Sequence, residues 1–150
     1  MTTYDHTQQG MIHWIVAGSG LACLALGASG DISAEGAWIP LVIAALFGFV
    51  APCFAHLRVR DAGGALEIAF GPVRVFKKTV RYEAIRSANV GRSALIDGWG
   101  IHWVPGRGWI WNLHGFRCVE LGLQDGSKLR IGTDDPAGLE TFIRSRITPA

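Results

Sequence analysis

The chain has 150 residues, of which 49% are hydrophobic and only 17% are charged, and its formal net charge is +2. Globular domains in solution are about 25% charged, so this composition argues against an ordinary soluble domain. Residues 1–56 contain three acidic residues and no Lys or Arg, whereas residues 57–150 contain 14 basic and 9 acidic residues, a formal +5. This modest excess argues against a nucleic-acid-binding protein, and we expect no nucleic acid partner.

The chain begins with a polar segment, residues 1–10, which we expect to be a frayed N-terminal tail. Residues 11–28 then form an apolar run, MIHWIVAGSGLACLALGA, in which His13 is the strongly polar member. The run is near the lower length limit of a membrane span. A signal peptide is the alternative, but it would start with a basic segment, and this leader contains Asp5 and no Lys or Arg.

A second and longer apolar run extends from Trp38 to His56 and contains no charged residue. At ~1.5 Å per residue, a helix of this length spans roughly the 30 Å hydrocarbon layer of a bilayer. We therefore predict a two-helix transmembrane hairpin over residues 11–56, with a short acidic loop at 29–36. Small residues at helical spacing are candidates for close helix packing in both runs; they are Gly18, Ala22, Ala44 and Gly48.

The positions of the basic residues predict the orientation of this hairpin. Arg58 and Arg60 come directly after the second run, and the loop between the runs has no basic residue. Because Lys and Arg are enriched on the cytoplasmic side of membranes, both termini are expected in the cytoplasm. The predicted location is therefore the cell inner (cytoplasmic) membrane, crossed by two spans that are integral to the lipid.

Residues 57–150 have the pattern of a β-rich domain. Apolar and polar residues alternate in short segments, which is the period of a half-buried strand. Turn signals separate these segments at Gly71-Pro72, at residues 105–108 and at Asp125-Gly126. About seven short strands are predicted in this way. They lie at residues 66–70, 73–82, 84–90, 99–104, 109–113, 119–123 and 128–131.

The last predicted element is an amphipathic helix. Asp134 or Asp135 is a suitable N-cap, and Pro136 fits the first helical position. Apolar residues then recur at helical spacing up to Ile147. We expect the apolar side of this helix to lie against the sheet.

Several segments of this domain carry a resemblance to a known family. They are LEIAFGP at 66–72, YEAI at 82–85, GWGI at 98–101, and VEL, DG and IGTDDP between 119 and 136. Together with the order of about seven strands and one helix, they resemble the pleckstrin-homology (PH) superfold. More specifically, the chain resembles small bacterial membrane proteins with a PH-like domain behind one or two membrane helices.

The resemblance implies an antiparallel PH-like β-barrel or sandwich at residues 57–150, capped by the C-terminal helix. The expected fold class is thus a membrane α-helical hairpin plus an α+β domain. PH-like domains as a class bind phosphoinositides, peptides or other proteins, and the bacterial ones are not generally phosphoinositide readers. The shared segments are turns, caps and core positions, so the resemblance indicates the fold and says little about activity.

The sequence contains no recognisable catalytic or metal-binding pattern. Nucleotide-binding, serine-hydrolase and zinc-protease motifs are all missing, and the three cysteines form no pair at a close spacing. His13 and His56 fall on different predicted spans and could together ligate a haem or a metal, which we keep as the least favoured alternative. We expect no enzyme activity, no cofactor and no metal.

Two groups of residues are candidates for binding lipid or a protein partner. One is a basic run beside the membrane, whose members are Arg58, Arg60, Arg74, Lys77, Lys78 and Arg81. The other is a tryptophan-rich hairpin, in which a small sheet cannot easily bury every ring. Its candidate contact residues are Trp103, Arg107, Trp109 and Trp111.

The sequence favours a membrane-anchored, non-enzymatic interaction or scaffolding module that binds a protein partner or its own copies. The alternative is a module that binds anionic lipid through the basic strand face and the tryptophan-rich hairpin. A haem or metal protein that uses His13 and His56 is the third and weakest reading.

Overall fold

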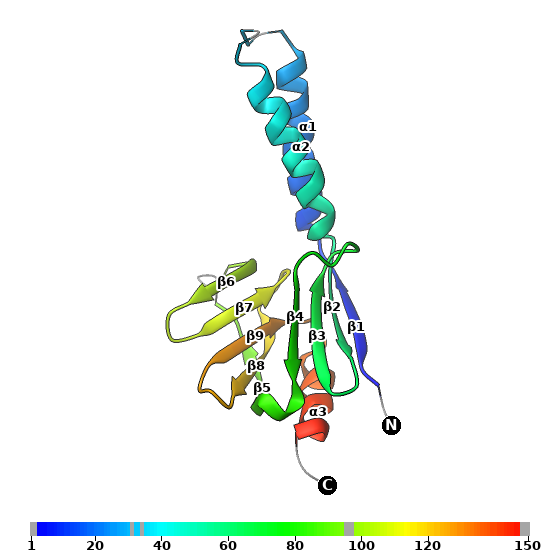
Figure 1. Ribbon diagram of the computed structural model, residues 1–150, viewed down its shortest axis with the longest axis vertical. Helices are drawn as coiled ribbons and strands as arrows, with labels where there is room; N and C mark the ends of the chain where they lie inside the picture. The colour runs from blue at the N-terminus through cyan, green and yellow to red at the C-terminus, as the bar shows by residue number, and fades with distance from the viewer. Residues whose placement is uncertain (1–2, 31, 34, 95–97, 148–150) are drawn as a thin grey trace.

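The computed structural model describes residues 3–30, 32–33, 35–94 and 98–147. Within them it contains two β-sheets, three α-helices and one short 3-10 helix (Figure 1). The helices α1 (Ile12–Ala28) and α2 (Trp38–Cys53) form a hairpin that projects from the β part along the long axis of the molecule.

The first sheet has the order β1-β2-β3-β4, and every neighbouring pair is antiparallel. Its strands are β1 (Asp5–Gln9), β2 (His56–Asp61), β3 (Ala65–Phe70) and β4 (Lys77–Arg81). The helical hairpin is inserted between β1 and β2, which pair directly with each other from Asp5↔Arg60 to Gln9↔His56. The hairpin is therefore held at both ends by adjacent strands of one sheet.

The second sheet has the order β5-β8-β9-β7-β6. Its strands are β5 (Ile85–Arg92), β6 (Gly100–Val104), β7 (Gly108–Asn112), β8 (Arg117–Leu123) and β9 (Lys128–Gly132). Its pairs are antiparallel except for β7 and β9, which run parallel. The 3-10 helix η1 (Tyr82–Ala84) connects the two sheets.

One apolar core lies between the two sheets and α3 (Pro136–Ile147). This core follows from the alternation of apolar and polar residues along the strands, since successive side chains point to opposite faces of a sheet. On β3, Leu66, Ile68 and Phe70 are all fully buried. Leu139 and Ile143 of α3, one helical turn apart, are also fully buried, and α3 packs mainly on β5. The predicted C-terminal helix is thus confirmed.

The predicted transmembrane hairpin is wrong. Among the described residues, no helix is long and apolar enough to cross a membrane. The helices α1 and α2 have 17 and 16 residues, which at ~1.5 Å per residue is shorter than the roughly 30 Å hydrocarbon layer. Only part of the second apolar run is helical. The helix α2 ends at Cys53, directly after Pro52, and β2 begins at His56. The two spans, the inner-membrane location and the sidedness deduced from them are overturned with it.

The predicted antiparallel β-barrel is also wrong, because neither sheet closes on itself or on the other. The sheets end at β4 and at β6, which leaves each of these strands with an unpaired edge. The parallel pairing of β7 with β9 is incompatible with a purely antiparallel arrangement. Two further details differ from the prediction: residues 5–9 form β1 rather than a tail, and residues 73–76 precede β4 rather than belonging to it.

Candidate functional site

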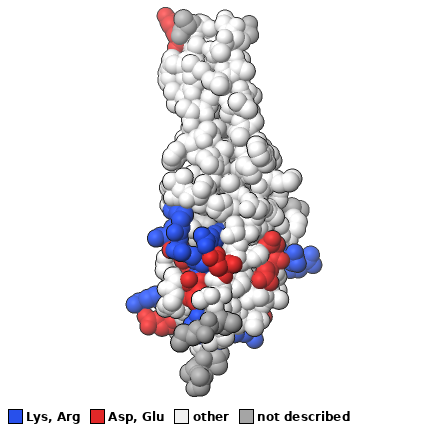
Figure 2. All heavy atoms as spheres, turned by 90° about the vertical axis from the view of Figure 1, so that its right-hand side faces the viewer, with Lys and Arg blue, Asp and Glu red and all other residues white. Residues whose placement is uncertain are grey.

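The helical hairpin exposes large hydrophobic side chains on both of its helices. On α1, Trp14 is 71% exposed and Leu21 is 67% exposed, and on α2 Trp38 and Phe49 are 60% and 58% exposed. Figure 2 shows one face of the hairpin as a long uncharged surface above the charged side chains of the β part. Contiguous apolar surface larger than a few hundred Å² usually marks an interaction site.

A groove of about 720 Å³ lies along the two helices. Small residues of both helices line it, among them Gly20, Ala44 and Gly48. A Cβ atom added to Gly20 would lie 3.0 Å from Cβ of Phe47, so α1 and α2 approach closely at this residue. A Cβ atom added to Gly48 would meet nothing within 4 Å, so the groove is open there. Of the predicted packing residues, Gly18 also faces open space rather than the other helix.

Backbone contacts fix the base of the hairpin on the first sheet. The N–H of Gly10 donates to the carbonyl of Ala55 at 3.0 Å, and the N–H of Gly71 donates to the carbonyl of His56 at 2.8 Å. Gly71 has a φ of +65°, and a Cβ there would lie 2.7 Å from the backbone of Cys53. Glycine is therefore required where the β3–β4 turn meets the end of α2.

Neighbouring carboxylates pair with most residues of the predicted basic face. Arg58 donates to Asp5 from Nε at 2.7 Å and from Nη2 at 2.5 Å. These hydrogen bonds hold the pKa of the Asp5 carboxyl below its usual value. Arg81 pairs with Glu83 at 3.1 Å, and both of those side chains are exposed.

Three more residues of this face surround Glu67, whose side chain is only 9% exposed. Arg60 Nε lies 2.8 Å from Glu67 Oε1, and Lys77 Nζ lies 3.8 Å from Oε2. Arg74 makes an ion pair with the same carboxylate. Five of the six predicted basic residues are thus paired, but with three carboxylates, since three of the cations share Glu67. About half of the positive charge of this face is therefore compensated.

The sixth basic residue, Lys78, meets the tryptophan-rich hairpin. Its Nζ lies 6.0 Å from the ring centroid of Trp109, and both residues line a pocket of about 560 Å³ with Trp103. Trp103 and Trp109 are directly paired across β6 and β7. They are 57% and 45% exposed. The structure therefore brings together three of the predicted candidate residues in one pocket.

The remaining two candidates lie elsewhere. Trp111 is 7% exposed and belongs to the core, where its ring centroid lies 5.8 Å from that of Phe70. Arg107 lies in the β6–β7 turn, and its backbone N–H donates to the carbonyl of Val104 at 3.1 Å. Neither side chain lines the Lys78 pocket.

The two histidines of the haem or metal alternative line different pockets. His13 lies beside the helical groove, and His56 lies in a small pocket with Arg58 and Arg74. Burial, together with the nearby Arg58 guanidinium, lowers the pKa of His56. Among the residues that the structure describes, no group of three or more His, Cys, Asp or Glu side chains is placed to hold a metal ion.

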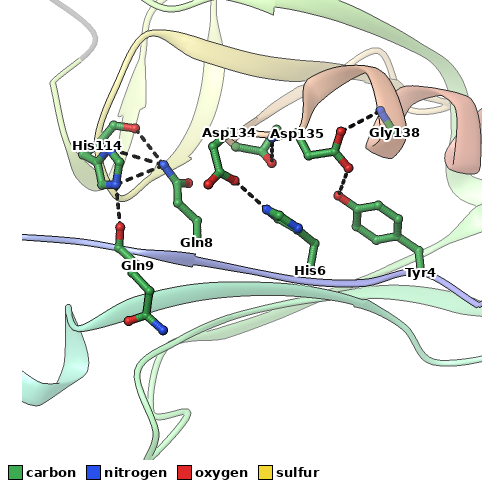
Figure 3. Close-up of polar contacts among 9 residues, drawn as sticks. Tyr4, His6, Gln8, Gln9, His114, Asp134, Asp135 and Gly138 are labelled. Atoms are coloured by element: carbon green, nitrogen blue, oxygen red, sulfur yellow. Dashed lines mark hydrogen bonds and ion pairs between the residues drawn. The ribbon is translucent and has the colours of Figure 1, made fainter.

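Sequence reasoning missed a polar cluster on β1 (Figure 3). His6 Nε2 lies 2.5 Å from Asp134 Oδ1, and the Tyr4 hydroxyl donates to Asp135 Oδ2 at 3.3 Å. Gln8 is 3% exposed, and its side-chain amide donates to the carbonyl of His114 at 3.3 Å. Tyr4, directly before β1, and His6 and Gln8 within it occupy alternate positions and make these contacts. All three are polar, so no hydrophobic periodicity marked this segment as a strand.

Comparisons with protein-family models and with curated proteins found no match to this chain.

Proposed function

We propose that this chain is a non-enzymatic interaction module that self-associates through its helical hairpin. One observation carries the proposal: the hairpin presents exposed aromatic and aliphatic side chains along α1 and α2, and a groove lined by small residues runs between them. Leaving such a surface in water is unfavourable by roughly 25 cal/mol for each Å² of apolar area. The resemblance of residues 57–150 to PH-like domains remains a prediction, and it is compatible with a protein-binding role.

A second copy of the chain is the occupant that fits this groove best. The sequence has no charged residue from 6 to 30 or from 36 to 57, so recognition by ion pairs is not available to a partner of the hairpin. An uncharged apolar surface is complementary to itself, and a two-fold axis would place the same groove of each copy against the other. The open space above Gly48 would allow the two backbones to approach closely.

The alternative function, binding of anionic lipid through the basic strand face, is less well supported. Five of the six residues proposed for it already pair with carboxylates in the structure. These pairs compensate about half of the positive charge of this face, which weakens its attraction to an anionic headgroup.

The test compares Gly48→Leu with Gly18→Leu in the full-length chain. Both positions have open space for the new side chain, and both changes replace a poor helix former by a good one. Only Gly48 lines the groove, so its leucine would fill the space that a second copy needs. The measurement is sedimentation equilibrium over a range of concentrations. We expect wild type and Gly18→Leu to form dimers or larger assemblies with similar dissociation constants. The dissociation constant of Gly48→Leu should be at least about tenfold higher, because its self-association is weaker.

Three outcomes would contradict self-association through the groove. The first is a wild-type chain that remains monomeric at every concentration. The second is an equal effect of the two leucine variants. The third is a monomer that binds to phospholipid vesicles in a flotation assay, because lipid rather than a second copy would then cover the apolar surface. Circular dichroism of each variant shows whether the helices are retained.

A further inference from the structure

A second pocket is lined by no residue of the helical hairpin. Lys78 of β4, at the edge of the first sheet, lines it together with residues of the β6–β7 hairpin and of the turn between β8 and β9. The pocket there has a volume of about 560 Å³, within the roughly 300–1,000 Å³ range of small-molecule sites. It belongs to the part of the structure where the predicted barrel fails to close.

Two tryptophans provide an apolar wall for this pocket. Trp109 shares a strand face with Trp111, and its partner on β9 is Leu129; both of these residues are buried in the core. Trp109 therefore faces the same side of the sheet as the core, yet it is 45% exposed. Its neighbour Trp103 is 57% exposed. Two adjacent exposed indole rings form a surface on which a flat apolar group can stack.

Lys78 reaches the pocket from the opposite sheet. Its partner on β3 is Ile68, which is fully buried, and it shares a strand face with Val80, which is 5% exposed. The lysine therefore points inward from an edge strand. Lys77, the adjacent residue, lies on the other face and pairs with Glu67. Among the described residues, no carboxylate lies within ion-pair distance of the Lys78 ammonium, whose recorded contact is the Trp109 ring.

Two other charged residues, Asp125 and Lys128, line the pocket. Asp125 Oδ1 accepts hydrogen bonds from the Ser127 hydroxyl at 2.7 Å and from its backbone N–H at 2.9 Å. Lys128 Nζ lies 4.0 Å from Glu120 Oε1. Hydrogen bonds from Ser127, and to a smaller extent the Lys78 charge, lower the pKa of Asp125, so this carboxylate keeps its negative charge. Glu120 is shared by Lys128 and Arg130. The pocket is therefore lined by two lysines and one aspartate, an excess of positive charge beside two exposed aromatic rings.

We infer that this pocket binds a small aromatic carboxylate, whose ring stacks on Trp103 and Trp109 while its carboxylate pairs with Lys78. The inference goes beyond the proposed function, since none of its residues belongs to the helical hairpin. An inward-pointing lysine on an edge strand can also serve only to prevent edge-to-edge aggregation of sheets, and the experiment distinguishes these roles.

The experiment measures binding of 2-naphthoate to the full-length chain by equilibrium dialysis. The matched probe 2-naphthylmethylammonium carries the opposite charge on the same ring system. We expect wild type to bind the carboxylate at least about tenfold more tightly than the ammonium, since the carboxylate can pair with Lys78 whereas the ammonium is repelled by Lys78 and Lys128. Lys78→Met should lower the affinity for naphthoate about tenfold, and Trp109→Ala should lower it as well.

Two control variants make the result specific. Lys77→Met removes a lysine next to Lys78 but from the other strand face, and Trp38→Ala removes an exposed tryptophan from the helical hairpin. Both should bind naphthoate as wild type does. The inference is overturned if wild type binds no naphthoate, if Lys78→Met binds it unchanged, if the ammonium probe binds more tightly, or if Trp38→Ala lowers binding as much as Trp109→Ala.

Discussion

Asp135 joins the two ends of the described chain through its two carboxylate oxygens. Oδ1 accepts the backbone N–H of Gly138 at 3.0 Å and so caps the start of α3. Oδ2 accepts the hydroxyl of Tyr4, whose ring stacks on Phe142 with centroids 5.4 Å apart. Its neighbour Asp134 contacts His6 at the surface. The two adjacent aspartates therefore have unequal structural roles.

Asp135→Ala should lower the free energy of unfolding by about 1–3 kcal/mol, because it removes a helix cap and leaves the Tyr4 hydroxyl without its acceptor. Asp134→Ala, in which an exposed pair is lost, should cost less than about 1 kcal/mol. Urea unfolding followed by circular dichroism measures both values. Equal costs for the two aspartates would show that Asp135 has no special role.

Ionisation of the chain's two tyrosines, Tyr4 and Tyr82, is expected to lower the free energy of unfolding at high pH. Burial, followed by the nearby carboxylate of Asp135, raises the pKa of Tyr4 above its ordinary value near 10. Burial, followed by a hydrogen bond to Asp61, raises the pKa of Tyr82 in the same direction. Between the unfolded and folded pKa values, the unfolded chain releases protons that the folded chain retains, so the free energy of unfolding falls as pH rises.

Urea unfolding from pH 8 to pH 11.5 tests this expectation. The tyrosine contribution is constant below about pH 10 and decreases above it. In the double variant Tyr4→Phe/Tyr82→Phe, which retains both rings, the decline above pH 10 should be shallower than in wild type. Parallel curves for the two proteins would assign the decline to other groups.

At the scale of elements, the sequence predicted the positions of most strands and of α3, because alternation and capping residues are local signals. It did not predict which glycines lie between α1 and α2. Gly18 was a candidate, but Gly20 and Gly27 face α2 in the structure. A change of two residues turns a helical side chain by roughly 200°, so the contact face depends on the rotation of each helix, and a run that is apolar on all sides does not reveal that rotation.

Gly20→Leu should therefore separate the two helices. Its side chain would collide with Phe47 Cβ and with the carbonyl of Ala44, which lie 3.0 and 3.5 Å from the position of the added Cβ. We expect a destabilisation of about 1–3 kcal/mol, typical of overpacking, and faster amide exchange along α1. Gly18→Leu, which faces open space, is the control and should exchange as wild type does. Similar exchange in the two variants would contradict the packing of the hairpin.

At the scale of the whole molecule, the barrel prediction failed because it depended on long-range pairing. The parallel contact of β7 with β9 joins segments that are not adjacent in the chain, and β4 and β6 remain at sheet edges instead of pairing to close a barrel. Local periodicity carries no information on such pairings. The transmembrane prediction depended on helix length, which the end of α2 at Cys53 shortened. Of the candidate site, the sequence identified Lys78, Trp103 and Trp109, but it could not place them in one pocket.

The pairing of β1 with β2 predicts that the N-terminal strand, the base of the helical hairpin and the first sheet unfold together. Gly10 and Ala55 are hydrogen-bonded across this base, and the buried Gln8 side chain ties β1 to His114 next to the second sheet. In native-state hydrogen exchange, the hydrogen-bonded amides of residues 5–9 should have protection similar to those of β2, and their opening should have the same dependence on urea. The exposed turn at Gly106 serves as the rapidly exchanging control. Exchange of residues 5–9 as fast as that of Gly106 would mean that β1 is a tail, and that the hairpin is held by the first sheet at one end only.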